Sequence, residues 1–283
     1  MRRLLCTDLD RTLIPNGEDE ESPGARSALA QLVANAPLAL AYVSGRSLAQ
    51  VLEAIETWAL PIPDVIAADV GSSVHHRDGR GWRADRHWET RVAGQWQGER
   101  QERIGELLAN VVGLVPQEHA RQMPYKRSYV LTPGAERTRL ESDVRAPLEA
   151  DGIRAALVFS HDPEAGIELL DVLPADGTKL HAVRHVREAL DVPLAGTVYA
   201  GDSGNDLDVL VSDVPAVLVA NGDAATRQAA VGGVRASGRE DRLYLAGEGV
   251  DASRYGRLSG CYAGGIVEGL VHFHPALASR FDD

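Results

Sequence analysis

The sequence predicts an α/β protein with a doubly wound, mostly parallel sheet and a second, inserted α+β domain. Short apolar segments alternate with helical patterns over residues 1–83 and again over 173–283. Such alternation is typical of a parallel sheet with helices on both faces. Between these regions, over residues 84–172, helical patterns occur beside apolar segments separated by polar turns, as in antiparallel sheets. We therefore expect a core formed by residues 1–83 and 173–283 and an inserted domain of residues 84–172.

Composition excludes several classes of protein. The chain has 283 residues, long enough for one large domain or two small ones, with a net charge of −12. This charge disfavours nucleic acid and anionic membranes as main partners. Two cysteines, Cys6 and Cys261, form no disulfide framework. The apolar run after Met1-Arg2-Arg3 is too short for a signal peptide, and no apolar run approaches the ~20 residues of a membrane span. We expect a soluble, cytoplasmic protein.

The first core segment alternates strands and helices. An apolar run that starts at Leu4, and the runs Leu38–Val43 and Asp64–Ala68, predict three strands. Ser22-Pro23 is a helix start, because Ser is a good N-cap and Pro suits the first helical position. Apolar residues at helical spacing over Leu48–Ile55 predict a second helix.

The inserted segment combines both element types. Helical spacing marks Ile104–Val111 and Leu140–Leu148, whereas Ala155–Phe159 and Ile167–Leu173 are predicted strands. The stretch Gln117–Leu131 is also predicted to be rich in strand.

The core pattern then resumes. Thr178 is a predicted N-cap for a helix that extends to Leu190. Thr197–Ala200 and Val214–Val219 are predicted strands, and Gly260–Phe273 is rich in glycine with apolar residues at helical spacing.

Two carboxylates lie where the first strand ends. Asp8 and Asp10 are one residue apart, and alternate residues of a strand share a face, so both point the same way. Carboxylates this close repel each other, and a cation between them relieves the repulsion. The pattern by itself is also typical of a turn, where Asp and Thr are common.

Three later stretches carry polar residues that we expect near Asp8 and Asp10. Ser44-Gly45-Arg46 follows the second strand, Lys179 opens a helix, and Asp202 to Asp206 follow the strand Thr197–Ala200. Open α/β sheets bind ligands at the carboxyl ends of their strands, so we expect these groups to meet. Only two of the 29 basic residues are lysines, and an ammonium in a first helical turn opposes the helix dipole. Lys179 is therefore favoured as a functional residue.

In this order, the four stretches resemble the four motifs of the haloacid-dehalogenase-like (HAD) phosphohydrolases, and the resemblance extends over the whole chain. It implies that Asp8 is a nucleophile that forms an aspartyl-phosphate. It implies that Asp10 is the general acid and base, and that Lys179 bridges the nucleophile and the phosphate. The implied phosphate-binding residues are Ser44, Gly45, Lys179 and Asn205. The implied Mg²⁺ ligands are Asp8, Asp10, Asp202 and Asp206, with Asp206 either a direct ligand or a group behind one.

The insertion has the size of a type-IIB cap, and three stretches resemble the sucrose-phosphate phosphatase family. They are Gln117 with Gln122–Ser128, Leu170–Pro174 and Ala263–Leu270. This resemblance implies hydrolysis of a small-molecule sugar phosphate, sucrose 6F-phosphate, to sucrose and phosphate, with a sugar-phosphate synthase acting upstream. The expected substrate-binding residues are Arg46, Gln122, Lys126 and Ser128.

Alternatives remain open at this point. Other glycoside phosphates, of the mannosylfructose, glucosylglycerol or glucosylglycerate type, and a HAD phosphomutase share the pattern. A receiver-like signalling domain uses similar groups, but its acidic pair precedes the phosphorylated Asp, which is the reverse of the order found here. Cys6 is expected to be a buried strand residue. The nine histidines show no metal-ligand spacing and are expected to be structural or exposed.

Overall fold

The computed structural model describes residues 2–162, 165–247 and 258–280. Its larger sheet has eight strands with β1 near the middle, in the order β12-β11-β10-β1-β2-β3-β4-β5. The strands from β12 to β3 pair in parallel, and β4 and β5 add an antiparallel hairpin at one edge. In chain order the strands are β1 (Arg3–Thr7), β2 (Leu38–Val43), β3 (Val65–Ala68), β4 (Ser73–Asp78), β5 (Gly81–Ala84), β10 (Thr197–Gly201), β11 (Ala216–Leu218) and β12 (Leu243–Leu245).

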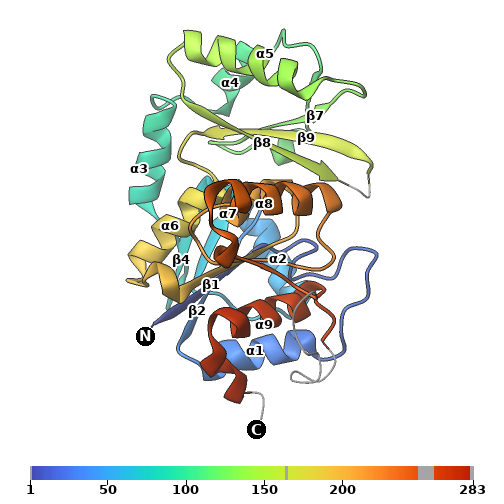
Figure 1. The fold of residues 1–283 in the computed structure, drawn as a ribbon. Helices are drawn as coiled ribbons and strands as arrows, with labels where there is room; N and C mark the ends of the chain where they lie inside the picture. The colour runs from blue at the N-terminus through green and yellow to red at the C-terminus, as the bar shows by residue number, and fades with distance from the viewer. Residues whose placement is uncertain (1, 163–164, 248–257, 281–283) are drawn as a thin grey trace.

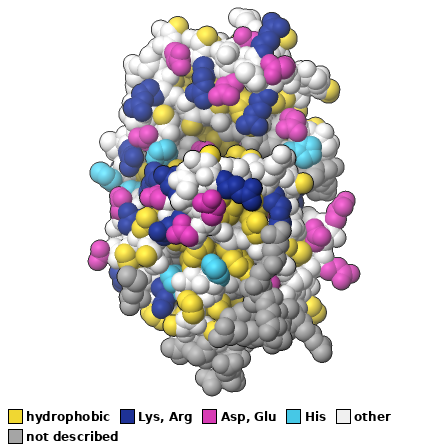
Figure 2. Space-filling view, viewed as in Figure 1, with side chains coloured by type: hydrophobic (Ala, Val, Ile, Leu, Met, Phe, Trp, Pro, Cys, Tyr) yellow, Lys and Arg dark blue, Asp and Glu magenta, His cyan; other side chains and the backbone are white. Residues whose placement is uncertain are grey.

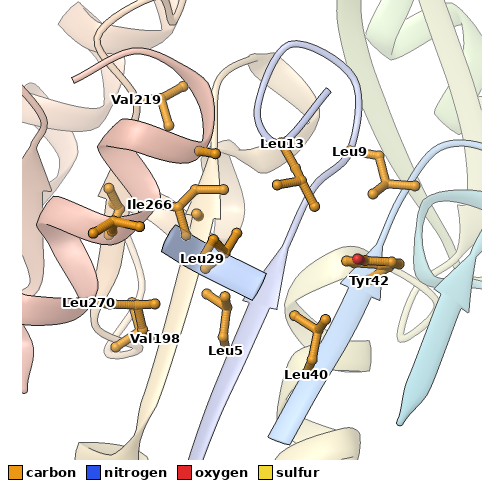
Figure 3. Packing of buried hydrophobic residues seen from close by; sticks show 14 of the residues in the cluster. Leu5, Leu9, Leu13, Leu29, Leu40, Tyr42, Val198, Val219, Ile266 and Leu270 are labelled. Carbon is orange, nitrogen blue, oxygen red and sulfur yellow. The ribbon is translucent and has the colours of Figure 1, made fainter. Parts of the chain in front are cut away.

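Helices cover both faces of this sheet. One face packs against α1 (Ala25–Asn35), α2 (Leu48–Thr57) and α9 (Tyr262–Phe273). Figure 3 shows this packing, with Leu29 of α1 and Ile266 and Leu270 of α9 near Leu5 of β1. The other face packs against α3 (Arg86–Gln95), α6 (Lys179–Ala189), α7 (Leu207–Leu210) and α8 (Ala224–Ser237), and Cys6 is buried in this layer, as predicted.

A second, antiparallel sheet lies above the first in Figure 1. Its strands, in spatial order, are β6 (Leu114–Pro116), β7 (Arg127–Leu131), β9 (Ile167–Pro174) and β8 (Ala155–Asp162). The helices α4 (Gln101–Leu108) and α5 (Arg137–Ala150) pack on it around a separate apolar cluster. The predicted doubly wound sheet with an α+β insertion is confirmed. The boundaries at 83/84 and 172/173 stay a prediction, and the second falls inside β9.

Two local predictions were wrong: a tertiary contact explains the first, and hydrogen bonds within the loop explain the second. Helix α1 begins at Ala25 with Gly24 as its N-cap, because the Ser22 hydroxyl instead bonds the Ser259 hydroxyl, 237 residues away. Most of the stretch before β7 is not strand. The Gln122 side chain bonds the backbone of this loop, and Pro124 has no N–H for a sheet ladder.

The surface carries mixed charge. Figure 2 shows basic and acidic side chains interspersed over the face in view, rather than separated into regions of one sign. Within the described ranges, no helix has both the length and the apolar character needed to cross a bilayer.

Helix α9 approaches the sheet so closely that glycine is required in it. A Cβ at Gly269 would lie 2.1 Å from Cγ2 of Val217 in β11, and Val217 is fully buried. Because Val217 is branched at Cβ and enclosed, it has little room to yield. Gly269 therefore allows the close approach of α9 to β11.

We expect Gly269→Ala to destabilise the protein by roughly 1–3 kcal/mol, the usual penalty of overpacking. Gly232→Ala in α8 is the matched control, because Gly232 is exposed and an added Cβ there meets nothing within 4 Å. The free energy of unfolding of that control should rise by roughly 0.5–1 kcal/mol, because Ala has a better helix propensity than Gly. Urea unfolding of both variants measures the two changes, and shifts of the same sign would contradict this account of α9.

Candidate active site

The strand order reverses between β1 and β10. Strands β2 and β3 lie on one side of this point and β11 and β12 on the other. Ligands of open α/β sheets bind at such a switch point, outside the carboxyl ends of the strands. Asp8 directly follows β1, and Asp202 directly follows β10. Parallel pairing of these two strands therefore brings together carboxylates that are 194 residues apart in sequence.

A buried ammonium lies between the two acidic loops. Lys179 Nζ is 3.1 Å from Asp8 Oδ2, 2.7 Å from Asp206 Oδ1 and 2.7 Å from Asn205 Oδ1. The Lys179 side chain is only 1 % exposed. Burial lowers the pKa of Lys179, but the charges of Asp206 and Asp8 outweigh this effect and hold it above its usual value. Lys179 is therefore charged, and its position is fixed from three sides.

Asp206 orients the loop that carries Asp202. Its Oδ1 accepts hydrogen bonds from Lys179 and from the Tyr199 hydroxyl. Its Oδ2 accepts the backbone N–H groups of Asp202, at 2.9 Å, and Ser203, at 3.1 Å. Both oxygens are thus engaged within the protein. This geometry favours a positioning role for Asp206 over direct metal ligation.

The acidic cluster is suited to a divalent cation. Asp8, Asp202 and Asp206 are buried, and each offers a carboxylate oxygen within 4.8 Å of the others. Asp8 Oδ1 is buried and has no hydrogen-bond partner among the described residues. Burial raises the pKa of Asp8 well above its usual value despite Lys179, and burial together with the charge of Asp206 raises the pKa of Asp202 to about 6. Carboxylates destabilised in this way are good ligands for an ion such as Mg²⁺, which prefers oxygen.

Arg11 is a site residue that the sequence analysis missed. Its Nε and Nη2 donate to Asp202 Oδ2 at 2.9 and 2.6 Å, while Thr12 Oγ1 donates to Oδ1 at 2.9 Å. Arg11 also adopts a positive φ of 56°, which is uncommon for a residue other than glycine. A cation that binds Asp202 Oδ2 has to compete with this guanidinium. The one signal in the sequence is the position of Arg11 between Asp10 and Thr12.

Arg46 forms a bidentate ion pair with Asp10. Its Nε lies 2.8 Å from Asp10 Oδ2, and its Nη2 lies 2.6 Å from Oδ1. Burial raises the pKa of Asp10, but the hydrogen bonds and charge of Arg46 outweigh burial and leave the pKa below its usual value. Asp10 is therefore a carboxylate in this arrangement. Arg46, expected to bind substrate, lies at the site but faces the second aspartate.

The loop after β2 faces the same edge. Ser44 is fully buried, and its Oγ accepts the backbone N–H of Arg46 at 3.2 Å. The carbonyl of Gly45 accepts a hydrogen bond from Lys126 Nζ of the inserted segment at 3.1 Å. The phosphate-binding loop expected from the sequence is thus in contact with the second sheet's domain.

The three expected residues of the insertion differ in what they contact. Lys126 is buried and reaches the core. Gln122 instead bonds the backbone of its own loop at Gln117 and Ser128. The Ser128 hydroxyl donates to Asp171 within the second sheet. Gln122 and Ser128 therefore shape the loop that presents Lys126.

Asp69 is a second residue missed by the sequence analysis. It follows β3, and both Asp69 and Val70 have positive φ, at 55° and 62°. A β-branched residue in this region is strained, and such strain gathers at functional sites. Asp69 Oδ1 is buried and has no hydrogen-bond partner in the described ranges. Burial raises the pKa of Asp69, and the nearby positive charge of Lys126 counteracts the rise.

We expect Lys179→Met to destabilise the metal-free protein by about 3–5 kcal/mol, because Asp8 and Asp206 lose their buried counter-charge. Arg184→Met, on the same helix α6, is the control. Arg184 and Asp213 form an exposed pair, so its loss should change stability by about 0–1 kcal/mol. Urea unfolding in the presence of a chelator measures both variants, and equal losses would refute the structural role given to the buried ammonium.

Comparisons with known proteins agree with this geometry. The family model of sucrose-6F-phosphate phosphohydrolase matches residues 1–274. A HAD-like hydrolase of Nitrosococcus oceani is 40% identical over 272 residues, which cover 96% of this chain and 72% of that protein. The mannosylfructose-phosphate phosphatase of Agrobacterium fabrum is 29% identical over 223 residues, or 77% of this chain and 83% of that protein.

A solved structure of a sucrose-phosphatase is also similar to this chain. The sucrose-phosphatase of Synechocystis sp. PCC6803, in complex with sucrose and phosphate, superposes with a TM-score of 0.74 and 26% identity. The match covers 96% of this chain and 98% of that structure. The chain belongs to the sucrose-6F-phosphate phosphohydrolase family and is a HAD-type sugar phosphatase.

Proposed function

We propose that this protein is a Mg²⁺-dependent phosphatase that hydrolyses sucrose 6F-phosphate to sucrose and phosphate. The observation that carries the chemistry is the convergence of Asp8, Lys179 and Asp202 at the switch point of the sheet. Membership of the family over residues 1–274 supports the choice of substrate. The reaction would occur in the cytoplasm, after a synthase that makes the sugar phosphate.

Asp8 is the proposed nucleophile. Its Oδ2 pairs with Lys179, and the unpartnered Oδ1 is the oxygen available to attack phosphorus. A bond forms between this oxygen and phosphorus while the bond from phosphorus to the sugar oxygen breaks. The covalent intermediate splits one difficult step into two easier ones. Lys179 offsets the charge on the phosphoryl group, with Ser44, Gly45 and Asn205 as further donors around it.

Asp10 is the proposed proton donor and acceptor. It protonates the departing sugar oxygen, because an alkoxide leaves poorly, and then takes a proton from the water that cleaves the aspartyl-phosphate. For the first step Asp10 must be protonated, yet Arg46 keeps it ionised. The substrate phosphate offers Arg46 a competing anion. Release from Arg46 would raise the pKa of Asp10 and prepare it to act as the acid.

The proposed Mg²⁺ ligands are the carboxylates of Asp8 and Asp202 and the backbone carbonyl of Asp10, with Asp206 orienting Asp202. When bound, the ion would neutralise charge on the phosphoryl oxygens. On this chain, Arg11 is the residue that has to leave Asp202 Oδ2, and it would then be free to face the anionic substrate.

The segment 84–172 is proposed as a cap that selects the sugar. Lys126 is placed to donate to sugar hydroxyls, and Asp69 Oδ1, which has no partner among the described residues, is an acceptor close enough to feel the charge of Lys126. A neighbouring donor and acceptor suit the hydroxyl groups of a carbohydrate. The resemblance to a mannosylfructose-phosphate phosphatase keeps other glycoside phosphates as a second candidate class of substrate.

We expect Asp8→Asn to reduce phosphate release from sucrose 6F-phosphate by roughly 10⁴-fold or more, the scale on which a lost nucleophile acts. The change is isosteric and removes charge repulsion, so the fold should remain. Asp208→Asn is the control, because Asp208 lies six residues after Asp202 but is exposed. Phosphate release is assayed with Mg²⁺ present. Activity retained by Asp8→Asn would reject the proposed nucleophile.

The substrate is tested with a panel of sugar phosphates at saturating Mg²⁺. We expect kcat/KM for sucrose 6F-phosphate to exceed that for glucose 6-phosphate and fructose 6-phosphate by about 10²-fold or more, because buried polar groups discriminate strongly when left unpaired. The mannosylfructose, glucosylglycerol and glucosylglycerate phosphates belong in the same panel. A preference for a monosaccharide phosphate would contradict the proposal, and transfer of phosphate to a second sugar would indicate a mutase.

A further inference from the structure

A cluster of three metal-ligand side chains lies outside the active site. His76 Nε2 and His185 Nε2 each lie 2.8 Å from Asp85 Oδ2. These three atoms come from three segments: strand β4, the residue between β5 and α3, and helix α6. Two imidazoles and one carboxylate oxygen thus converge on one point. The two histidines, His76 and His185, are 109 residues apart in the sequence.

We propose that His76, Asp85 and His185 bind a divalent transition-metal ion of the zinc class at the entrance to the cap, separate from the acidic cluster. Three protein ligands of the type His₂-carboxylate, with a fourth position left for water, form a common zinc set. Two nitrogen ligands favour zinc over Mg²⁺, which prefers oxygen. Each imidazole would present its Nε2 lone pair and keep its proton on Nδ1.

The carboxylate is oriented independently of the two histidines. Asp85 is the N-cap of α3, and its Oδ1 accepts the backbone N–H groups of His87 and Trp88, both at 3.0 Å. Oδ2 is therefore held toward His76 and His185. Groups behind a ligand that fix its direction strengthen metal binding. The ring of Trp88 also packs against His185, with ring centroids 4.8 Å apart, which restricts the second imidazole.

The cluster is enclosed but accessible. The side chains of His76, Asp85 and His185 are 22 %, 13 % and 11 % exposed. The partial exposure of His76 leaves the cluster open to an ion and its water without unfolding of the segment. A cavity of about 110 Å³ lies beside the cluster and is lined by Asp85, Trp88 and His75, but not by His76 or His185.

The position gives the ion a mechanical role. Asp85 lies between the last strand of the core hairpin, β5, and helix α3, which packs on the core sheet before the chain continues to the second sheet. His185 lies on α6, the helix that begins with Lys179 of the active site. A bound metal ion would therefore clamp the start of α3 to the helix that carries the catalytic ammonium.

The chain supplies its own control. His75 and His76 are neighbours on β4, and because successive strand residues face opposite sides, His75 points away from His76. His75→Gln therefore changes a neighbouring histidine that is not one of the three proposed ligands. Asp85→Asn is a second test variant beside His76→Gln, since Asn is as good an N-cap as Asp and preserves the start of α3 while removing the charged ligand.

The experiment uses the full chain, stripped with a chelator and then kept in a large excess of Mg²⁺ to occupy the acidic cluster. Zn²⁺ is titrated by calorimetry, and the midpoint of thermal unfolding is followed in parallel. Wild type and His75→Gln should bind one Zn²⁺ with the same Kd and gain thermal stability. His76→Gln and Asp85→Asn should bind that ion at least tenfold more weakly and lose the gain in stability.

Absence of stoichiometric Zn²⁺ binding by wild type would overturn the proposal. Equal binding by wild type and both ligand variants would also overturn it, since the metal would then be at the acidic cluster. Loss of binding in His75→Gln to the same extent would do so too. None of these results depends on activity toward a sugar phosphate, so they leave the proposed function untouched.

Discussion

The contact between Lys179 and the two aspartates around it is the constraint on which the rest of the site depends. An ammonium that is 1 % exposed is stable only with charged partners, and Asp8 and Asp206 supply them. Asp206 in turn holds the backbone of the Asp202 loop, so one ion-pair network aligns the ends of β1 and β10 and the start of α6. Gly201 belongs to the same network, because a Cβ there would lie 2.6 Å from Asp206 Oδ2. The acidic edge is thus assembled around a fixed positive charge.

Two arginines, Arg11 and Arg46, pair with aspartates of the site in a more exposed setting than Lys179. Arg11 pairs with Asp202 and Arg46 with Asp10, so two of the aspartates are held by guanidinium groups that are partly exposed. A guanidinium on a partly exposed, flexible side chain can be exchanged for another cation or drawn to an incoming phosphate. The buried lysine, by contrast, is enclosed by three partners. The site therefore combines one fixed cation with two that are able to move as ligands arrive.

The inserted segment contacts the core at several places, including an apolar contact of Val70 with Val158 and Leu173, and two polar contacts bear on the sites described above. Lys126 bonds the carbonyl of Gly45 above the active site, and the segment around Asp85 ties the hairpin β4–β5 to α3 and α6. The first contact lies beside the residues that would touch a phosphate, and the second lies at the start of α3. Motion of the inserted segment would have to break or turn about these contacts, which would link the proposed cap to the chemistry of the core.

The sequence by itself determined the fold class, the strand ends that carry Asp8, Ser44 and Asp202, and the importance of Lys179. It could do so because strand and helix periodicities are local, and parallel strands place their carboxyl ends on one edge. It was wrong about the N-cap of α1, because the Ser22 hydroxyl bonds the distant Ser259 hydroxyl. It was also wrong about much of the stretch before β7, where the Gln122 side chain bonds the backbone of its own loop.

Only the tertiary structure decided how the polar groups pair. The bonds of Arg11 to Asp202 and of Lys126 to Gly45 join residues that are far apart in sequence and that no periodicity connects. The same holds for His76, Asp85 and His185, which no spacing rule connects. Pairing of this kind depends on which side chains the folded core brings within about 3 Å of each other, because hydrogen bonds form only at that range.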